Sequence, residues 1–254
     1  MALNKKEQIS ELLKGIETGD PAVVAVVNEA KYIQHNPQTH EGSEGLAALF
    51  KRLSKTSPKV NIVRVFEDDD FVFAHTEYDF ANRNVGFEIF RFEDNQAVEH
   101  WDNIQKRQGP NSSGHTMVDG VTEVTDHEFT ESNRTIVRTF VEDVLIKGYV
   151  DKLNDYVIQG HYKEHSPRFS DDLGELCAVL SKSTRHSIQI SYEKCHRILA
   201  EGNFVLSICE GISKQVPFSF FDLYRLENGK IVEHWDTTEA IPPKDKWKNN
   251  NGKF

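Results

Sequence analysis

The sequence predicts an α+β protein built from two tandem copies of one cone-shaped unit, each a curved antiparallel sheet wrapped around about three helices. Short motifs recur in the same order in the two halves of the 254-residue chain. In each half, segments with helical periodicity come first and segments with strand alternation follow. Turns that contain Asp or Asn separate the alternating segments, which is typical of an antiparallel meander. These observations indicate helices first and one sheet second, in both halves.

Two pairs of motifs mark the duplication. Residues 32–37 read YIQHNP and residues 162–167 read YKEHSP, while VEHWD occurs at 98–102 and again at 232–236. This period is longer than the roughly 20–50 residues of a solenoid repeat, so it indicates two copies of a whole domain. We expect the first unit at 1–118, a polar linker at 119–128 and the second unit at 129–254.

The first part of each copy has helical periodicity. Apolar side chains from Ile9 to Ile16 recur on one face of a helix predicted over 5–18. Pro21 favours the first turn of a second helix, predicted over 21–33. The remaining predicted helices are 45–53 in the first copy and 132–147, 149–160 and 172–182 in the second.

The second part of each copy alternates between apolar and polar residues. This period of two predicts antiparallel strands joined by tight turns, and Asn228-Gly229 suits a two-residue hairpin turn. A sheet folded around helices encloses a cone, which is a natural ligand pocket. The predicted strands are 60–66, 71–78, 85–92 and 97–105 in the first copy, and 187–198, 203–212, 216–226 and 230–238 in the second.

Charge and composition exclude several classes of partner. The chain has 30 Lys and Arg against 40 Asp and Glu, a net charge of −10, without a dense basic cluster. We therefore expect neither a nucleic-acid partner nor an anionic membrane surface. No stretch approaches the roughly 20 apolar residues of a membrane span, and we expect no secretory signal from the pattern of the first residues. Cys177, Cys195 and Cys209 have no Cys-x-x-Cys spacing, so we expect free thiols and a cytoplasmic protein.

Several of these motifs together resemble the SnoaL-like polyketide cyclase family of the nuclear-transport-factor-like superfamily. They are YIQHNP at 32–37, FEIFRF at 87–92, EHWD at 99–102 and Gln105. The resemblance covers both copies and so nearly the whole chain. It implies a cone-shaped fold and, for the named cyclases, an aldol-type ring closure without metal or organic cofactor. An acidic pocket residue handles the protons in that reaction, and the resemblance places it at Asp102 and Asp236.

The residue pattern points to the same strands. His100 and Asp102 are two residues apart, as are His234 and Asp236, so each pair shares one face of its strand, while Trp101 faces the other way. A carboxylate beside an imidazole can act as a general acid/base pair. The alternative is a hydrogen-bonded pair that only fixes the last strand in place.

Glu88 and Asp222 occupy equivalent positions in otherwise apolar strands. Glu88 shares its face with Phe90 and Phe92, which predicts that it points toward the pocket as a candidate base. The alternative is an ordinary surface charge.

Other polar residues are candidates for holding a substrate. His35 precedes Pro37 at the predicted end of the second helix, where it would bind or protonate a substrate oxygen, or else cap the helix. His75 has Ile208 as its counterpart, which indicates that the two copies have divided roles. The candidate substrate-binding residues are Tyr32, His75, Gln105, His165 and Asp222, although Tyr32 also fits a core aromatic.

We expect no metal and no cofactor. His35, His75, His100 and Asp102 could ligate an ion, but no His-x-x-x-His or His-Glu-x-x-His spacing supports this. The glycine-rich phosphate-binding patterns and the Gly-x-Ser-x-Gly motif are also absent from the sequence.

The predicted function is binding of a small apolar carbonyl compound with cofactor-independent proton transfer: cyclisation, isomerisation or dehydration. A non-catalytic binding or interaction module is the alternative, and the enzyme question stays open at this point. We also expect the two units to pair as an intramolecular pseudo-dimer, with Trp101 and Trp235 near the contact, and the chain to be able to form a homodimer.

Overall fold

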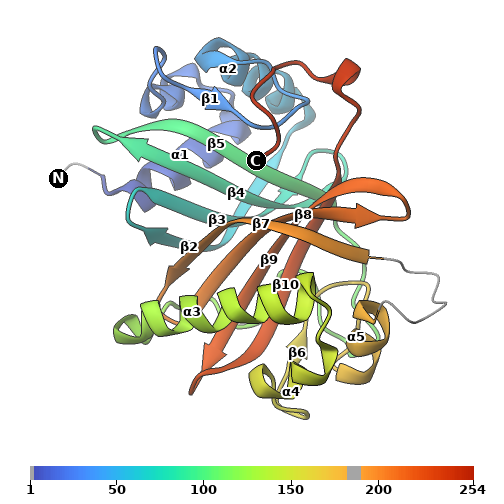
Figure 1. Ribbon diagram of the computed structural model, residues 1–254. Helices are drawn as coiled ribbons and strands as arrows, with labels where there is room; N and C mark the ends of the chain where they lie inside the picture. The colour runs from blue at the N-terminus through green and yellow to red at the C-terminus, as the bar shows by residue number, and fades with distance from the viewer. Residues whose placement is uncertain (1–2, 182–189) are drawn as a thin grey trace. The chain divides into compact units, whose positions relative to one another are not determined.

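The computed structural model describes residues 3–181 and 190–254 and has two compact units (Figure 1). Unit 1 comprises Met1–Arg107 and Ile241–Phe254, and unit 2 comprises Gln108–Ala240. This division differs from the predicted boundaries, because 108–118 group with unit 2 and the C-terminal segment groups with unit 1. Neither segment has a periodic pattern, so their long-range contacts could not be predicted from sequence.

Unit 1 is an α+β unit with a five-stranded sheet of order β1-β5-β4-β3-β2 among the described residues. The pairing of β1 with β5 is parallel, and the other pairings are antiparallel. Figure 1 shows α1 and α2 on one face of this sheet. The elements are α1 (Lys5–Thr18), η1 (Pro21–Val26), β1 (Ile33–Gln34), α2 (Gly42–Leu53), η2 (Ser54–Thr56), β2 (Lys59–Asp68), β3 (Phe71–Asp79), β4 (Arg83–Glu93), β5 (Gln96–Lys106) and η6 (Lys244–Lys246).

Unit 2 repeats this arrangement with the described strands in the order β6-β10-β9-β8-β7. The predicted helix 172–182 and strand 187–198 each extend partly into 182–189, which lies outside the described residues. The elements are η3 (His127–Phe129), α3 (Thr130–Phe140), the π-helical η4 (Val141–Ile146), η5 (Val150–Lys152), α4 (Leu153–Tyr156), β6 (Lys163–Glu164), α5 (Leu173–Leu180), β7 (Ile190–Glu201), β8 (Phe204–Ser213), β9 (Val216–Glu227) and β10 (Lys230–Ala240).

Helix α1 follows directly from its sequence. The Asn4 side chain accepts a hydrogen bond from the Glu7 N–H at 2.9 Å, and Glu7 accepts one from the Asn4 N–H, which completes a capping box. The helix ends at Gly19, whose φ of +68° suits a left-handed C-cap. Ile9 and Ile16 are 0% and 4% exposed, so the predicted apolar face lies in the core.

The second helix of each copy is much shorter than predicted. Residues 21–26 form a 3₁₀ helix, and Ile33 and Gln34 form a short strand parallel to β5. Residues 23–27 include four valines, and β-branched side chains disfavour an α-helix. The His35 N–H donates to the His100 carbonyl at 2.9 Å, so His35 follows a strand and caps no helix. His165 pairs with His234 in the same way at 2.8 Å.

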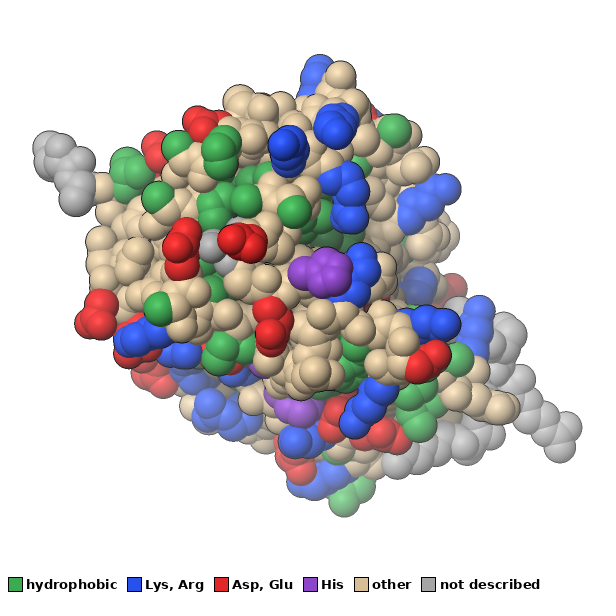
Figure 2. All heavy atoms as spheres, turned by 90° about the horizontal axis from the view of Figure 1, so that it is seen from above, with side chains coloured by type: hydrophobic (Ala, Val, Ile, Leu, Met, Phe, Trp, Pro, Cys, Tyr) green, Lys and Arg blue, Asp and Glu red, His purple; other side chains and the backbone are tan. Residues whose placement is uncertain are grey.

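Within residues 3–181 and 190–254, no helix combines the length and apolar character needed to cross a membrane. On the face that Figure 2 shows, acidic side chains lie mostly on the left of the upper half and basic ones mostly on the right, and the two kinds mix in the lower half. All three cysteines are free thiols, and Cys209 is buried.

Candidate functional site

Unit 1 contains a cavity between its helices and the concave face of the sheet. Its walls are mostly apolar, and five polar side chains meet at one end. The free volume is about 50 Å³, room for only a few water molecules, so a larger ligand would need apolar side chains to move aside. The main lining residues are Leu12, Leu13, Ile16, Leu46, Leu49, Phe50, Phe80, Phe90 and Ile104, with Gln34, Tyr78, Glu88, His100 and Asp102 at the polar end.

Glu88 and His100 form a buried acid–base pair at this polar end. They are 3% and 5% exposed, and Glu88 Oε2 lies 2.8 Å from His100 Nε2. The Tyr78 hydroxyl donates to Glu88 Oε1 at 2.7 Å, and His100 Nδ1 lies 3.1 Å from Gln34 Oε1. Both neighbours of the imidazole are acceptors, so His100 donates on both sides when protonated.

Asp102 lies directly across from Glu88 in the pairing of β4 with β5. It is 4% exposed, and its Oδ2 accepts a hydrogen bond from the Asn36 amide at 2.7 Å. Its Oδ1 has no hydrogen-bond partner among the described residues and lies 3.7 Å from Lys253 Nζ. A buried carboxylate oxygen without a hydrogen bond is costly and suits a ligand that donates to it.

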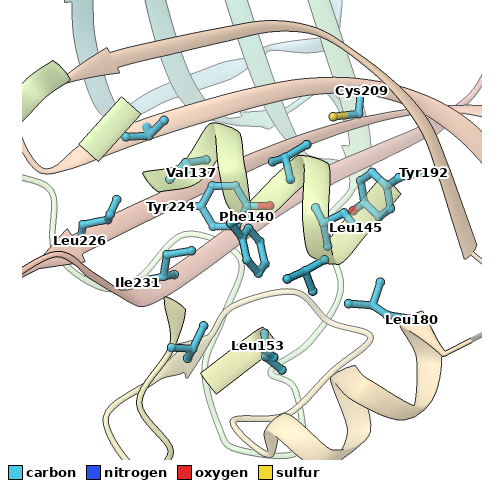
Figure 3. Close-up of a cluster of buried hydrophobic side chains, with 14 of the residues drawn as sticks. Val137, Phe140, Leu145, Leu153, Leu180, Tyr192, Cys209, Tyr224, Leu226 and Ile231 are labelled. Atoms are coloured by element: carbon cyan, nitrogen blue, oxygen red, sulfur yellow. The ribbon is translucent and has the colours of Figure 1, made fainter. Parts of the chain in front are cut away.

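Unit 2 contains a corresponding cavity of about 30 Å³. Figure 3 shows Phe140 from α3 beside Tyr224, and their ring centroids are 5.6 Å apart. The apolar wall of this cavity is part of the cluster of buried side chains that Figure 3 shows. The lining residues are Phe140, Leu145, Tyr162, Phe169, Leu176, Val179, Leu180, Ile190, Tyr192, Asp222, Tyr224, His234 and Asp236.

His234 in unit 2 lies between two carboxylates. Its Nδ1 is 2.8 Å from Glu164 Oε1, and its Nε2 is 3.1 Å from Asp222 Oδ1. Burial alone would lower the pKa of His234, but these carboxylates raise that pKa well above its ordinary value. Burial also raises the pKa of Asp222. The two carboxylates thus favour the imidazolium form of His234, in which both ring N–H groups can donate to them.

Asp236 is held more firmly than its counterpart in unit 1. Arg168 donates to Asp236 Oδ2, whereas Asp102 Oδ2 accepts from the neutral Asn36 amide and the Lys253 ammonium lies 3.7 Å from Asp102 Oδ1. Asp236 Oδ1 has no hydrogen-bond partner among the described residues. The cavity of unit 2 thus also presents an open carboxylate oxygen, beside a bound guanidinium.

A tyrosine hydroxyl reaches the strand acid in both units, from different strands. Tyr78 is on β3, whereas Tyr192 is on β7, and its hydroxyl donates to Asp222 at 3.1 Å. In the strand pairing, Val60 lies opposite Tyr78, and Gly211 lies opposite Tyr192. Burial raises the pKa of both tyrosines well above the usual value, so both stay protonated donors. Because the two tyrosines are not at equivalent positions, comparison of the two copies does not reveal them.

Gln34 and Glu164 are further site residues that the sequence analysis missed. Both lie within the recurring motifs YIQHNP and YKEHSP, immediately before the histidine. Each sits on a two-residue strand that brings it to the imidazole of the last strand. The signal was available as the single amide-for-carboxylate difference between the two copies at this position.

The structure separates some predicted site residues from the cavities. His75 is three residues from Tyr78 and so lies on the opposite face of β3, where its Nδ1 is 2.9 Å from Arg64 Nη1. Gln105 and Tyr32 are not among the residues that line the cavity of unit 1, although Tyr32 contacts Gln34 at 3.5 Å. Their predicted direct contact with a substrate is therefore not supported.

His35 and His165 lie behind the cavities, against the tryptophans. The rings of His35 and Trp101 stack with centroids 4.7 Å apart, and His165 stacks on Trp235 at 4.5 Å. Trp101 and Trp235 are 1% and 0% exposed. Neither His35 nor His75 lines the cavity that contains Asp102, whereas Tyr78 and Gln34 do.

The structure also changes the candidate metal ligands in unit 1. The four residues considered as possible ligands, His35, His75, His100 and Asp102, do not form a cluster among the described residues. One ligand atom from each of Glu88, His100 and Asp102 lies within 4.8 Å of the others, so these three could hold an ion. Both carboxylate oxygens of Glu88 and the Nε2 atom of His100 are, however, already engaged in hydrogen bonds.

Comparisons with known proteins give a family match within the first unit and several similar solved structures. No curated protein matches the chain significantly. Solved structures that are similar include TsrD from Streptomyces laurentii (20% identity, 41% of this chain and 92% of that chain, TM-score 0.36). Others are IdmH, a candidate polyketide cyclase from Streptomyces antibioticus (14%, 39% and 89%, TM-score 0.34), and an LEH-like epoxide hydrolase from M. tuberculosis (20%, 43% and 84%, TM-score 0.35). Residues 9–100, which lie within unit 1, match the model of the SnoaL-like domain family.

Proposed function

We propose that unit 1 binds a small, largely apolar carbonyl compound in its cavity and moves a proton on it. Asp102 is the base, and the Glu88–His100 pair is the proton donor. The observation that carries this proposal is Asp102 Oδ1, a buried carboxylate oxygen without a hydrogen bond at the polar end of an apolar cavity. Little water has access to a carboxylate at this position, so water competes only weakly with the carboxylate for a proton of the bound ligand.

The proton moves in two connected steps. Asp102 takes a proton from the carbon next to the carbonyl group, which leaves an enolate. The Glu88–His100 pair, whose Oε2 and Nε2 atoms lie 2.8 Å apart, then supplies its shared proton to the enolate oxygen. Tyr78 keeps Glu88 oriented through its 2.7 Å hydrogen bond. Two carboxylates in different surroundings thus have opposite roles, which is how acid and base are usually divided.

This chemistry is the common first step of aldol-type cyclisation, isomerisation and dehydration. The match of residues 9–100 to the SnoaL-like domain family supports a pocket of this kind. Which of the three reactions follows depends on the substrate, so the proposal concerns the enolising step.

For unit 2 a different observation favours binding without turnover. Two carboxylates hold His234, and Arg168 holds Asp236. Neutralising or moving any of these charges would break a buried ion pair, which costs several kcal/mol. We propose that the unit 2 cavity recognises a ligand polar group without moving protons.

The test begins with a panel of small cyclic ketones, whose binding is measured by thermal shift. Each bound ketone is then incubated with the protein in D₂O, and deuterium incorporation next to the carbonyl is followed by mass spectrometry. We expect the wild type to speed this exchange and Asp102→Asn to lose about 10²–10⁴-fold of the rate, with binding retained. Bound ketones that never exchange faster than in buffer would refute the catalytic proposal and leave a binding module.

A further inference from the structure

A second group of metal-ligating side chains lies in unit 2, outside its cavity. His115 and Asp119 belong to the segment that follows β5, and His165 follows β6. One ligand atom from each residue lies within 4.8 Å of the others, and the two imidazole centroids are 5.1 Å apart. Two imidazoles and a carboxylate are ligands that Zn²⁺ and related ions prefer.

We propose that His115, Asp119 and His165 bind a divalent first-row transition-metal ion such as Zn²⁺. Zn²⁺ takes imidazole nitrogen and carboxylate oxygen at about 2.0–2.2 Å, so its ligand atoms lie roughly 3–4 Å apart. Asp119 Oδ1 is 2.6 Å from His165 Nδ1, and the Asp119 side chain is 46% exposed, which allows the small adjustment. Water would fill the remaining position, and the ion would enter from solvent. This site does not depend on the proposed chemistry of unit 1.

The surroundings of His165 favour a cation at its Nδ1. This side chain is 1% exposed, and Nδ1 faces Asp119 and the Thr116 carbonyl, while Nε2 lies 3.3 Å from Glu233. All of these neighbours are acceptors, whereas a neutral imidazole has only one N–H to donate. With Nε2–H donated to Glu233, the Nδ1 lone pair is directed at the ion. Metal-bound histidines usually have such a carboxylate on the other nitrogen.

Side chains that contact the ligating residues hold the rest of the site in place. Arg225 donates to Glu233, and Asp171 lies 3.1 Å from His115 Nε2, so both imidazoles have an orienting carboxylate. Gly120 has a φ of +88°, and a Cβ there would lie 2.8 Å from Glu233 Oε1. The glycine therefore allows the chain after Asp119 to pass directly over the site.

Unit 1 provides an internal comparison. His35 repeats the contacts of His165, because its Nε2 is 2.8 Å from Glu99 and its ring stacks on Trp101. Its Nδ1 lies 3.1 Å from the Gly252 carbonyl. Gly252 corresponds to Gly114 in the other copy, so Lys253 occupies the position that corresponds to His115. A lysine in place of an imidazole disfavours a cation, so we expect one ion per chain, in unit 2.

The experiment uses the full chain after treatment with EDTA. Isothermal titration with ZnCl₂ should give one site per chain, and Co²⁺ should produce visible d–d absorption bands. We expect His115→Ala and Asp119→Asn each to weaken Zn²⁺ binding at least ten-fold and to remove the Co²⁺ bands. Glu233→Gln should weaken binding about 10–100-fold. His127→Ala is the matched control, because that imidazole is 64% exposed on the same unit and should leave binding unchanged.

Two results would overturn the site. The first is an EDTA-treated wild type that binds no Zn²⁺ although its thermal melt shows that it is folded. The second is equal Zn²⁺ binding by the wild type, His115→Ala and Asp119→Asn. If Glu88→Gln rather than these variants removed binding, the ion would lie in unit 1 and the assignment would be wrong.

Discussion

At the scale of single residues, one amide-for-carboxylate difference separates the two polar networks. Gln34 lies 3.1 Å from the His100 imidazole, and Glu164 lies 2.8 Å from His234. A neutral amide leaves His100 with one carboxylate partner, whereas His234 has two. The same architecture therefore places one carboxylate beside the imidazole in unit 1 and two in unit 2.

The two carboxylates beside His234 predict a pH dependence of stability. The carboxylates raise the pKa of His234 in the folded state, above the value of about 6.5 expected when unfolded. This stabilisation is fully present below about pH 6.5 and is lost as pH rises through the raised pKa. Glu164→Gln removes one carboxylate, so the difference in free energy of unfolding between wild type and variant should narrow with rising pH. Each pKa unit lost corresponds to about 1.4 kcal/mol.

Urea unfolding of both proteins between pH 6 and pH 9 measures this difference. Gln34→Glu is the matched variant, because it places a second carboxylate beside His100 and should introduce a similar pH dependence in unit 1. A wild-type-to-Glu164→Gln difference that is constant over this range would contradict the assignment of His234 as an imidazolium.

The tyrosine hydroxyls should also stabilise the fold measurably. Tyr78 is 1% exposed, and removing its hydroxyl leaves Glu88 Oε1 without that donor. We expect Tyr78→Phe to lower the free energy of unfolding by about 1–3 kcal/mol, with Tyr192→Phe in the same direction. Tyr149→Phe is the control, since Tyr149 is 47% exposed and should change stability by less than about 0.5 kcal/mol. Equal stability of all three variants would show that these hydroxyls contribute nothing.

Sequence could predict part of the site and not the rest, for a physical reason. The alternation of a strand places Glu88, His100 and Asp102 on the cavity side, and the structure has them there. Tyr78 and Gln34 come from other strands, and their approach depends on how those strands pair. The same limit misplaced His75, whose side of β3 is set by strand register.

At the scale of secondary-structure elements, long periodic segments were predictable and short ones were not. Helix α1 and the four long strands of unit 1 occur where the pattern predicts them. The strands β1 and β6 have two residues each, too few to show a period; β1 begins at the last residue of the helix predicted over 21–33, and β6 follows the helix predicted over 149–160. These two strands carry Gln34 and Glu164, so the missed elements are the ones that complete the site.

The long-range contacts of the segments after the last strand of each copy were also not predicted. The contacts of the C-terminal segment can be tested directly by substitution. Asn249 donates to the carbonyl oxygens of Asn36 and Thr39 at 2.7 and 3.0 Å within unit 1. Asn249→Ala leaves two backbone acceptors without this donor, so we expect a loss of about 1–3 kcal/mol. Asn250→Ala is the control at an exposed neighbouring position. Chemical unfolding of both variants measures this loss of stability, and identical unfolding midpoints would show that this segment does not hold unit 1 together.

At the scale of the whole molecule, the duplication provides two cavities with different chemistry. Unit 1 combines an open carboxylate oxygen with a proton-sharing pair, and unit 2 combines an open carboxylate oxygen with fixed charges. The pairing of the two units through Trp101 and Trp235 stays a prediction. The account therefore expects one reactive unit and one binding unit in the same chain.

The most direct measurement compares the deuterium exchange rate of one bound cyclic ketone in the wild type, Asp102→Asn and Asp236→Asn. These substitutions change equivalent positions, and each replaces a carboxylate by a nearly isosteric amide. The account predicts that Asp102→Asn loses about 10²–10⁴-fold of the exchange rate while Asp236→Asn stays within a few-fold of the wild type, with both variants folded. Exchange at the wild-type rate in Asp102→Asn, or an equal loss in both variants, would contradict it.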